Sequence, residues 1–254
     1  MPFDSAIRNK LQKMVTACRR ILTDEFTSQL QGLYGIQPTG EMASLASMPH
    51  LDDEHHTTAS LLLERVDHLA DGHSTDKKAA AEAIYRVIRE QAFTVLNRLA
   101  ALRMCEARGI VHECIGDGFQ SRGFQVYCTV VGASLGSTYE RYRVFLQCLF
   151  DEISLDLGVL FDRSSPLGLL FPREPALLEV LEVLDDEELK EIWAEDETIG
   201  WIYQYFNDPA ERKRMREESA APRNSRELAV RNQFFTPRYV VEFLTDNTLG
   251  RIWY

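Results

Sequence analysis

The chain has 254 residues, of which 45% are hydrophobic and 26% are charged, and its formal net charge is −11. This length and composition suit a globular protein with one large domain or two small ones. A run of about 18 apolar residues is absent, so we expect no membrane span. The N-terminus becomes charged within a few residues and lacks the apolar core of a signal peptide, so we expect a cytoplasmic protein.

The cysteines and histidines predict neither disulfides nor a metal site. Five dispersed cysteines without a Cys-x-x-Cys pair are typical of reduced thiols. Cys105, His112 and Cys114 lack a fourth ligand and the paired spacing of a zinc site. His55 and His56 follow three acidic residues, but neighbouring side chains point in different directions on most backbones.

Apolar residues recur at helical spacing over 3–31, 60–69 and 77–107. The third segment is the strongest predicted helix, with one broad apolar stripe. Four arginines are expected off or beside that stripe: Arg86, Arg89, Arg98 and Arg103. The region from Gly32 to Thr57 contains glycines and prolines and is predicted to be a loop.

The second half of the chain predicts further helices and one strand. Glycines are frequent over 109–136, and the β-prone run Phe124–Val131 predicts a single strand or hairpin arm. Ser137 to Glu140 has capping-box spacing and should begin a helix that ends near Leu157. Acidic helices are expected over 176–184, 186–193 and 197–206.

Charge reverses sharply near residue 208. Eleven acidic residues and one lysine lie between Glu174 and Glu197, whereas eight bases and five acids lie between Asp208 and Arg238. The basic stretch is either a solvated helix and linker or a surface that faces phosphates. For the second case the predicted DNA-binding residues are Arg212, Lys213, Arg214 and Arg216.

Two further local patterns are a predicted helix start near residue 236 and a nuclease-like spacing near residue 188. Thr236 and Pro237 resemble an N-cap followed by proline at the first helical position, and Gly250 should end that helix. Asp186, Glu188 and Lys190 have the spacing of a nuclease motif. They fall in a predicted helix, where side chains two positions apart diverge, so we do not expect a nuclease.

Three segments resemble large adenine-specific DNA methyltransferases of BREX and DISARM phage-defence systems and of restriction-modification enzymes. Leu177–Asn207 and Asn232–Trp253 are similar to the junction between the helical N-terminal domain and the methyltransferase domain. Phe93–Cys105 resembles a helix that these proteins carry early in the chain. The resemblance implies a mainly α fold, with a helical domain at 1–207, a basic linker at 208–231, and the first helix of a Rossmann-like methyltransferase domain at 232–254.

The resemblance also implies a cofactor, S-adenosyl-L-methionine. Phe235, Thr236 and Pro237 would lie near its methionine end, with Thr236 as the best polar contact and Gln233 and Phe234 beside them. Free backbone N–H groups at the start of a helix suit a carboxylate. The alternative is that Thr236 only caps the helix while Phe234 and Phe235 fill the core.

The catalytic motifs of this family are missing from the sequence. Family members use a Pro-Pro-aromatic motif to hold the flipped adenine and a glycine-rich turn to hold the cofactor. The chain contains no Pro-Pro pair, so no catalytic residue is predicted. We expect part of an enzyme that methylates double-stranded DNA in phage defence, together with other defence subunits. The alternative is a non-catalytic helical interaction subunit of a defence complex.

Overall fold

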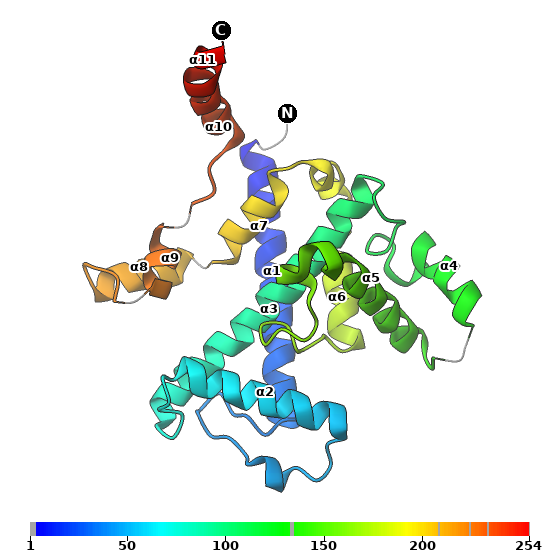
Figure 1. The fold of residues 1–254 in the computed structure, drawn as a ribbon, viewed down its shortest axis with the longest axis vertical. Helices are drawn as coiled ribbons and strands as arrows, with labels where there is room; N and C mark the ends of the chain where they lie inside the picture. The colour runs from blue at the N-terminus through cyan, green and yellow to red at the C-terminus, as the bar shows by residue number, and fades with distance from the viewer. Residues whose placement is uncertain (1–3, 133–134, 208, 224, 233, 254) are drawn as a thin grey trace. The chain divides into compact units, whose positions relative to one another are not determined.

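A computed structural model describes residues 4–132, 135–207, 209–223, 225–232 and 234–253, with only the backbone for 209–211 and 225–226. These residues are mainly helical (Figure 1), which confirms the expected mainly α fold. The described ranges contain no β-strand, and a single antiparallel bridge pairs Ile36 with Met42. The expected Rossmann-like domain is not confirmed by these residues and stays a prediction.

The contacts of the chain divide it into two compact units. One unit is Ala17–Asp186, and the other combines Met1–Thr16 with Glu187–Tyr254. A single helix, α1 (Ser5–Gly32), contributes its first turns to the second unit and the rest to the first. The domain limits expected from the sequence, at 207 and 231, stay predictions.

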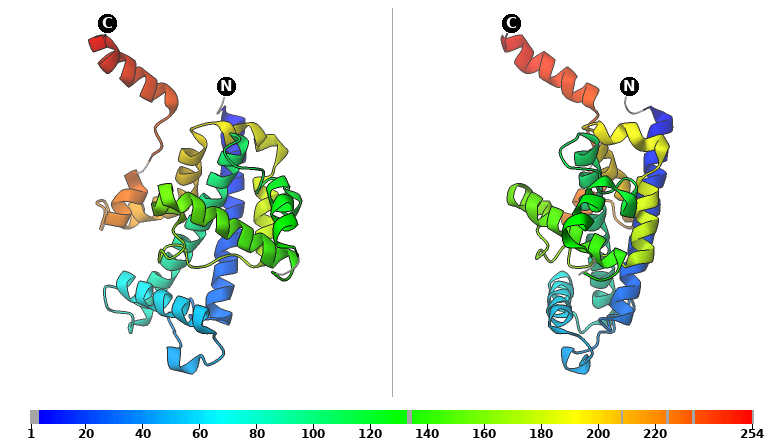
Figure 2. Two further views of the ribbon diagram at one scale, coloured as in Figure 1. Left: turned by 45° about the vertical axis from the view of Figure 1, so that its right-hand side comes forward. Right: turned by 90° about the vertical axis from the view of Figure 1, so that its right-hand side faces the viewer.

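The Ala17–Asp186 unit is built around one long helix, α3. Its elements after α1 are η1 (Leu45–Ser47), α2 (Asp53–Leu69), α3 (Lys77–Ala107), η2 (Gly118–Gln120), α4 (Arg122–Val131), α5 (Thr138–Phe161) and α6 (Glu174–Leu184). Helix α3 buries the predicted apolar stripe, and α2 packs against it (Figure 2). Arg65 of α2 bridges to Glu90 of α3 at 3.0 Å.

Two arginines of α3 are buried, which corrects the expectation that they lie off or beside the apolar stripe. Only 3% of Arg98 is exposed, and its guanidinium donates to the carbonyls of Leu160, Asp162 and Gly168 at 2.8, 2.7 and 3.1 Å. Arg103 binds Glu106 and Asp185. Arg98 therefore holds the loop after α5 against α3, because three backbone acceptors depend on one buried cation.

Helix α2 begins earlier than expected. Asp52 accepts the backbone N–H of His55 at 2.8 Å, and this N-cap extends the helix back to Asp53. Within the predicted loop, Gly40 approaches the backbone at the start of α3 and has a φ of +92°. A Cβ at Gly40 would lie 2.1 Å from the carbonyl oxygen of Lys77, so this approach requires glycine.

The segment Phe124–Val131 is helical, so the predicted strand was wrong. It forms α4, and Phe124 packs edge-on against Tyr142 of α5 at a ring-centroid distance of 5.0 Å. Tyr127, one turn later, lies 5.4 Å from the ring of Phe145. The β-branched residues favour a strand, but aromatic residues at helical spacing bury one face against α5.

Helix α5 confirms the predicted capping box. The Ser137 hydroxyl accepts from the Glu140 N–H at 3.3 Å, and the Glu140 carboxylate accepts from the Ser137 N–H at 2.6 Å. The hydroxyl of Tyr142 donates to the Cys114 carbonyl at 2.5 Å. These contacts fix the face that α5 presents to its own unit.

The second unit contains shorter helices. After the start of α1 they are η3 (Glu187–Ala194), α7 (Thr198–Phe206), α8 (Pro209–Glu218), α9 (Ser225–Asn232), α10 (Arg238–Thr245), η4 (Asp246–Gly250) and α11 (Arg251–Trp253). Trp193 and Ile202 are fully buried. The expected α-helix at 186–193 is a 3₁₀ helix, and the Thr198 hydroxyl donates to the Ile192 carbonyl at its end.

The stretch predicted as a solvated helix and basic linker forms α8 and α9, which contact each other. One further expectation changes in this unit. The helix expected to end at Gly250 continues through a π-helical turn to Trp253. Gly250 has a negative φ here and an ordinary helical place, so it does not act as a C-cap.

Candidate functional site

One face of α7 contacts residues 235–238. This segment contains the residues that the family resemblance predicts to lie near the cofactor. Glu197 occupies the N-cap position of α7, and Gly200, Trp201 and Gln204 follow it at steps of three, four and seven. Residues at this spacing share one side of a helix. All four contact the segment 235–238, so the two junction segments found in the sequence meet here.

Phe235 is the anchor of this contact. Its ring lies over Gly200, where a Cβ would come within 2.1 Å of two ring carbons. The ring also meets Trp201 edge-on at a centroid distance of 5.2 Å. Its backbone N–H donates to Oε1 of Gln204 at 2.7 Å. Glycine at position 200 therefore lets an aromatic ring lie directly on the helix backbone.

Glu197 caps the next helix, α10. Its Oε1 accepts the backbone N–H of Arg238, and its Oε2 lies 3.4 Å from the indole nitrogen of Trp201. Thr236 makes no capping bond, and Pro237 occupies the N-cap position, one residue later than predicted. The N-cap role expected for Thr236 is therefore taken by a carboxylate from α7.

The arrangement does not test the expected cofactor contact, but it shows one donor at the start of α10 already in use. The Arg238 N–H, the donor that would suit the methionine carboxylate, is already bound by Glu197. The Glu197 carboxylate would also repel a second carboxylate at the same place. Thr236 is exposed and Phe235 faces α7. A cofactor role for Phe235, Thr236 and Pro237 stays a prediction that requires Glu197 to release α10.

The aromatic residues expected beside the cofactor differ in exposure. Phe234 is exposed and lies under the guanidinium of Arg212, 5.1 Å from its ring centroid, so it does not fill the core. Phe235 is half-buried. Gln233 lies outside the described residues.

The four predicted DNA-binding residues separate into two pairs. Arg212 donates to the Val230 carbonyl at 3.0 Å, and Arg216 donates to the Arg231 carbonyl at 3.0 Å. Both side chains therefore join α8 to α9. Arg231 is itself 8% exposed and donates to the carbonyls of the loop between these helices.

Lys213 and Arg214 point to solvent. Their side chains are 78% and 66% exposed, and each faces a carboxylate one turn later, Glu217 at 3.8 Å and Glu218 at 3.6 Å. Exposed pairs of this length contribute little energy and give way easily to another anion. DNA binding stays a prediction, and these two cations are the ones that could serve it.

Some residues of the α7 contact were missed by the sequence reading. The signal was present in the spacing of Glu197, Gly200 and Gln204, but their partners lie more than thirty positions later in the chain. The described ranges also contain no group of three or more His, Cys, Asp or Glu side chains that could hold a metal ion. No helix in them is long and apolar enough to cross a membrane.

Comparison with known proteins finds two bacterial relatives. The chain is 23% identical over 207 residues to the adenine-specific methyltransferase PglX of Lacticaseibacillus casei strain Zhang, a match that covers 68% of this chain and 17% of that protein. It is 32% identical over 78 residues to the adenine-specific methyltransferase BrxX of Escherichia coli O9:H4 strain HS, covering 29% of this chain and 6% of that protein. The matches therefore span a small part of either relative.

These matches support the family that the junction segments suggested, at low identity. No protein-family model matches the chain. No solved structure matches it either.

Proposed function

We propose that this chain is the N-terminal helical part of an S-adenosylmethionine-dependent adenine-N6 DNA methyltransferase that acts in phage defence or restriction-modification. The observation that carries the proposal is a similarity over 68% of this chain to a protein named as an adenine-specific methyltransferase. That protein is several times longer, which supports a role as one part of a larger enzyme.

Catalysis in this proposal belongs to the rest of the enzyme. Bound S-adenosylmethionine supplies the methyl group, and this chain has no Pro-Pro-aromatic motif to hold an adenine. The residues present act by positioning. The α7 face fixes Phe235 and the start of α10, and α10 leads toward the cofactor domain.

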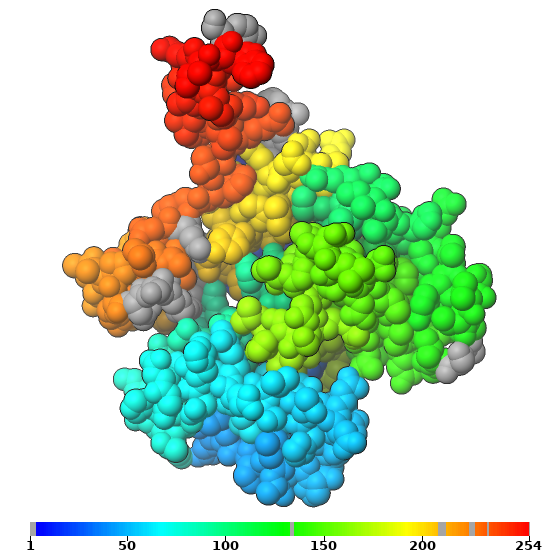
Figure 3. Space-filling view, in the orientation of Figure 1, coloured from blue at the N-terminus to red at the C-terminus, as the bar shows by residue number. Residues whose placement is uncertain are grey.

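The segment from α10 to α11 is drawn in orange-red to red in Figure 3. Seven of its large apolar side chains are about half exposed or more, and Trp253 is 89% exposed. These side chains are Tyr239, Val241, Phe243, Leu244, Leu249, Ile252 and Trp253. Apolar side chains gathered in this way are typical of a surface that another polypeptide covers. In the proposed enzyme that polypeptide is the methyltransferase domain.

The second candidate is a non-catalytic helical subunit of a defence complex. The same exposed apolar surface favours it, because a separate protein could cover α10 and α11 equally well. In the first candidate the covering surface belongs to the same polypeptide, and in the second it belongs to a separate protein.

Reading the coding sequence beyond codon 254 separates these candidates. The enzyme proposal expects the reading frame to continue into a glycine-rich turn and a Pro-Pro-aromatic motif. A stop codon at this point, with no such motifs in the frame, would contradict it and favour the interaction subunit.

A further inference from the structure

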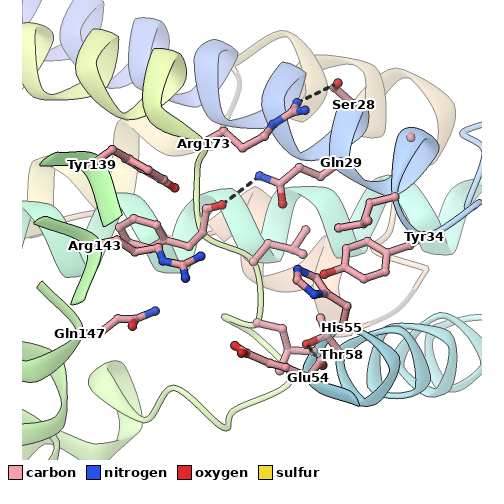
Figure 4. Close-up of a pocket in the computed structure, with 15 residues that line it drawn as sticks. Ser28, Gln29, Tyr34, Glu54, His55, Thr58, Tyr139, Arg143, Gln147 and Arg173 are labelled. Carbon is pink, nitrogen blue, oxygen red and sulfur yellow. Dashed lines mark hydrogen bonds between the residues drawn. The ribbon is translucent and has the colours of Figure 1, made fainter. Parts of the chain in front are cut away.

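The Ala17–Asp186 unit contains a cavity of about 510 Å³ that none of the preceding functions uses. Five segments line it: the end of α1, the turn that follows, α2, α5 and residues 169–173 (Figure 4). This volume lies in the range of sites for small ligands, roughly 300–1,000 Å³.

Two helices supply the polar walls. Tyr139, Arg143 and Gln147 lie one turn apart on α5, so they share a face. Arg143 and Gln147 enter the hollow from that side in Figure 4. Across from them are Tyr34 and His55, with Thr58 and Glu54 beside them.

Arg143 is the cation that this cavity leaves available. Its Nε is buried and has no hydrogen-bond partner in the described chain. A buried guanidinium donor without a partner is costly, and an oxyanion such as a phosphate satisfies a guanidinium with charge-assisted bonds. The nearby acid Glu140 has its carboxylate on the Ser137 N–H.

Two other basic side chains at the wall already have partners. Arg173 binds Glu25 at 2.7 Å and Ser28 at 3.0 Å. His55 binds Asp52 at 2.7 Å. An anionic ligand would therefore be drawn to Arg143 first.

Aromatic groups form the side opposite Arg143. Tyr34 is 4% exposed, and its ring lies 6.4 Å from that of His55. Burial raises the pKa of Tyr34 to about 12, so its phenol stays neutral and does not repel an anion. The Gln147 amide can both donate and accept, and the Glu54 carboxylate accepts.

We propose that this cavity binds a mononucleotide, with its phosphate on the Arg143 guanidinium and its base beside Tyr34 and His55. A guanidinium forms two parallel hydrogen bonds to a phosphate, which a single amide cannot replace. Flat rings offer a stacking surface to any base. The polar edge of the base lies within the part of the cavity lined by Gln147 and Glu54. This site does not depend on the proposed methyltransferase function.

Calorimetric titration of the whole chain tests the site with four probes: AMP, GMP, adenosine and inorganic phosphate. We expect at least one of the two nucleotides to bind at one site, and both adenosine and inorganic phosphate to bind at least tenfold more weakly. Arg143→Gln should weaken nucleotide binding about tenfold to hundredfold, as expected when charge-assisted bonds are removed. S-adenosylmethionine has no phosphate and should not compete.

Arg20→Gln is the matched control. Arg20 lies on α1 in the same unit, is 69% exposed, and does not line the cavity. It should leave nucleotide affinity unchanged. Thermal unfolding of both variants shows whether each remains folded, and amide shifts of Tyr34 and Gln147 on adding nucleotide locate the ligand.

Several results would overturn the proposal. They are no nucleotide binding at millimolar concentration, adenosine or phosphate binding as tightly as the tighter nucleotide, and unchanged nucleotide affinity in folded Arg143→Gln. Nucleotide binding that leaves the Tyr34 and Gln147 amides unshifted would also contradict it, because the ligand would then lie elsewhere.

Discussion

Gly200 shows at the scale of one residue how α7 receives the segment after α9. A methyl group at this position would meet the Phe235 ring at 2.1 Å, and the ring cannot retreat without leaving Trp201. Substitution by alanine normally stabilises a helix, so the sign of the effect at Gly200 is informative.

We predict that Gly200→Ala lowers the free energy of unfolding by about 1–2 kcal/mol, because overpacking outweighs the gain in helix propensity. The Phe235 amide should exchange its hydrogen faster, since displacement of the ring also breaks the bond from this amide to Gln204. Chemical denaturation and hydrogen exchange measure the two effects. Gly158→Ala is the control: nothing lies within 4 Å of a Cβ built there, so it should bring no steric cost and change the free energy of unfolding little. An effect of Gly200→Ala no larger than that of Gly158→Ala would mean that Phe235 does not rest on α7.

Arg98 concentrates three hydrogen bonds in one buried cation. We predict that Arg98→Met lowers the free energy of unfolding by about 3–5 kcal/mol, because three carbonyls are deprived of a charged donor. Lys78→Met on the same helix should cost less than about 1 kcal/mol, since the Lys78 side chain is exposed. Urea denaturation compares the two. A similar small decrease in both would show that Arg98 is not a structural clamp.

At the scale of elements, the sequence predicts helices well where one pattern dominates. Helix α3 has its predicted limits because a long apolar stripe and an Asp76 cap act together. Helix α4 was missed because its valines favour a strand, while Val126 and Val130 in fact face solvent. The contacts of Phe124 and Tyr127 with α5 favour a helix over a strand for this segment. These are tertiary contacts, which the local sequence pattern does not show.

The α8–α9 pair separates cations that join the two helices from cations that face solvent. In the proposed longer enzyme we predict that Lys213→Ala with Arg214→Ala lowers the dependence of DNA affinity on salt, by roughly 0.9 for each phosphate that is no longer neutralised. The decrease in affinity should be similar on specific and random duplexes. Arg212→Ala with Arg216→Ala should instead destabilise the helix pair, since both donate to α9. An unchanged salt slope in the first double variant would make α8 a solvated helix without a DNA role.

At the scale of the whole molecule, the junction was partly predictable. The segments that meet were visible in the sequence as family-like stretches, and the helical fold followed from periodicity. The cap on α10 was not predictable, because Glu197 reaches across forty-one positions to Arg238. The Arg143 cavity was not predictable either, since its walls come from five separate segments.

The exposed surface of α10 to α11 links the whole molecule to its proposed function. A helix with this apolar side is stable in a larger protein when another domain covers it. We therefore propose that this chain supports methylation without performing it.

Detection of N6-methyladenine in cellular DNA tests this supporting role. A host without its own adenine methylation would express either this chain alone or the full reading frame that contains it. We expect N6-methyladenine at one recurring DNA sequence with the full frame and none with the chain alone. Its disappearance on in-frame deletion of this segment would agree with a supporting role. Methylation by the chain alone, or none with a stably expressed full frame, would rule that role out.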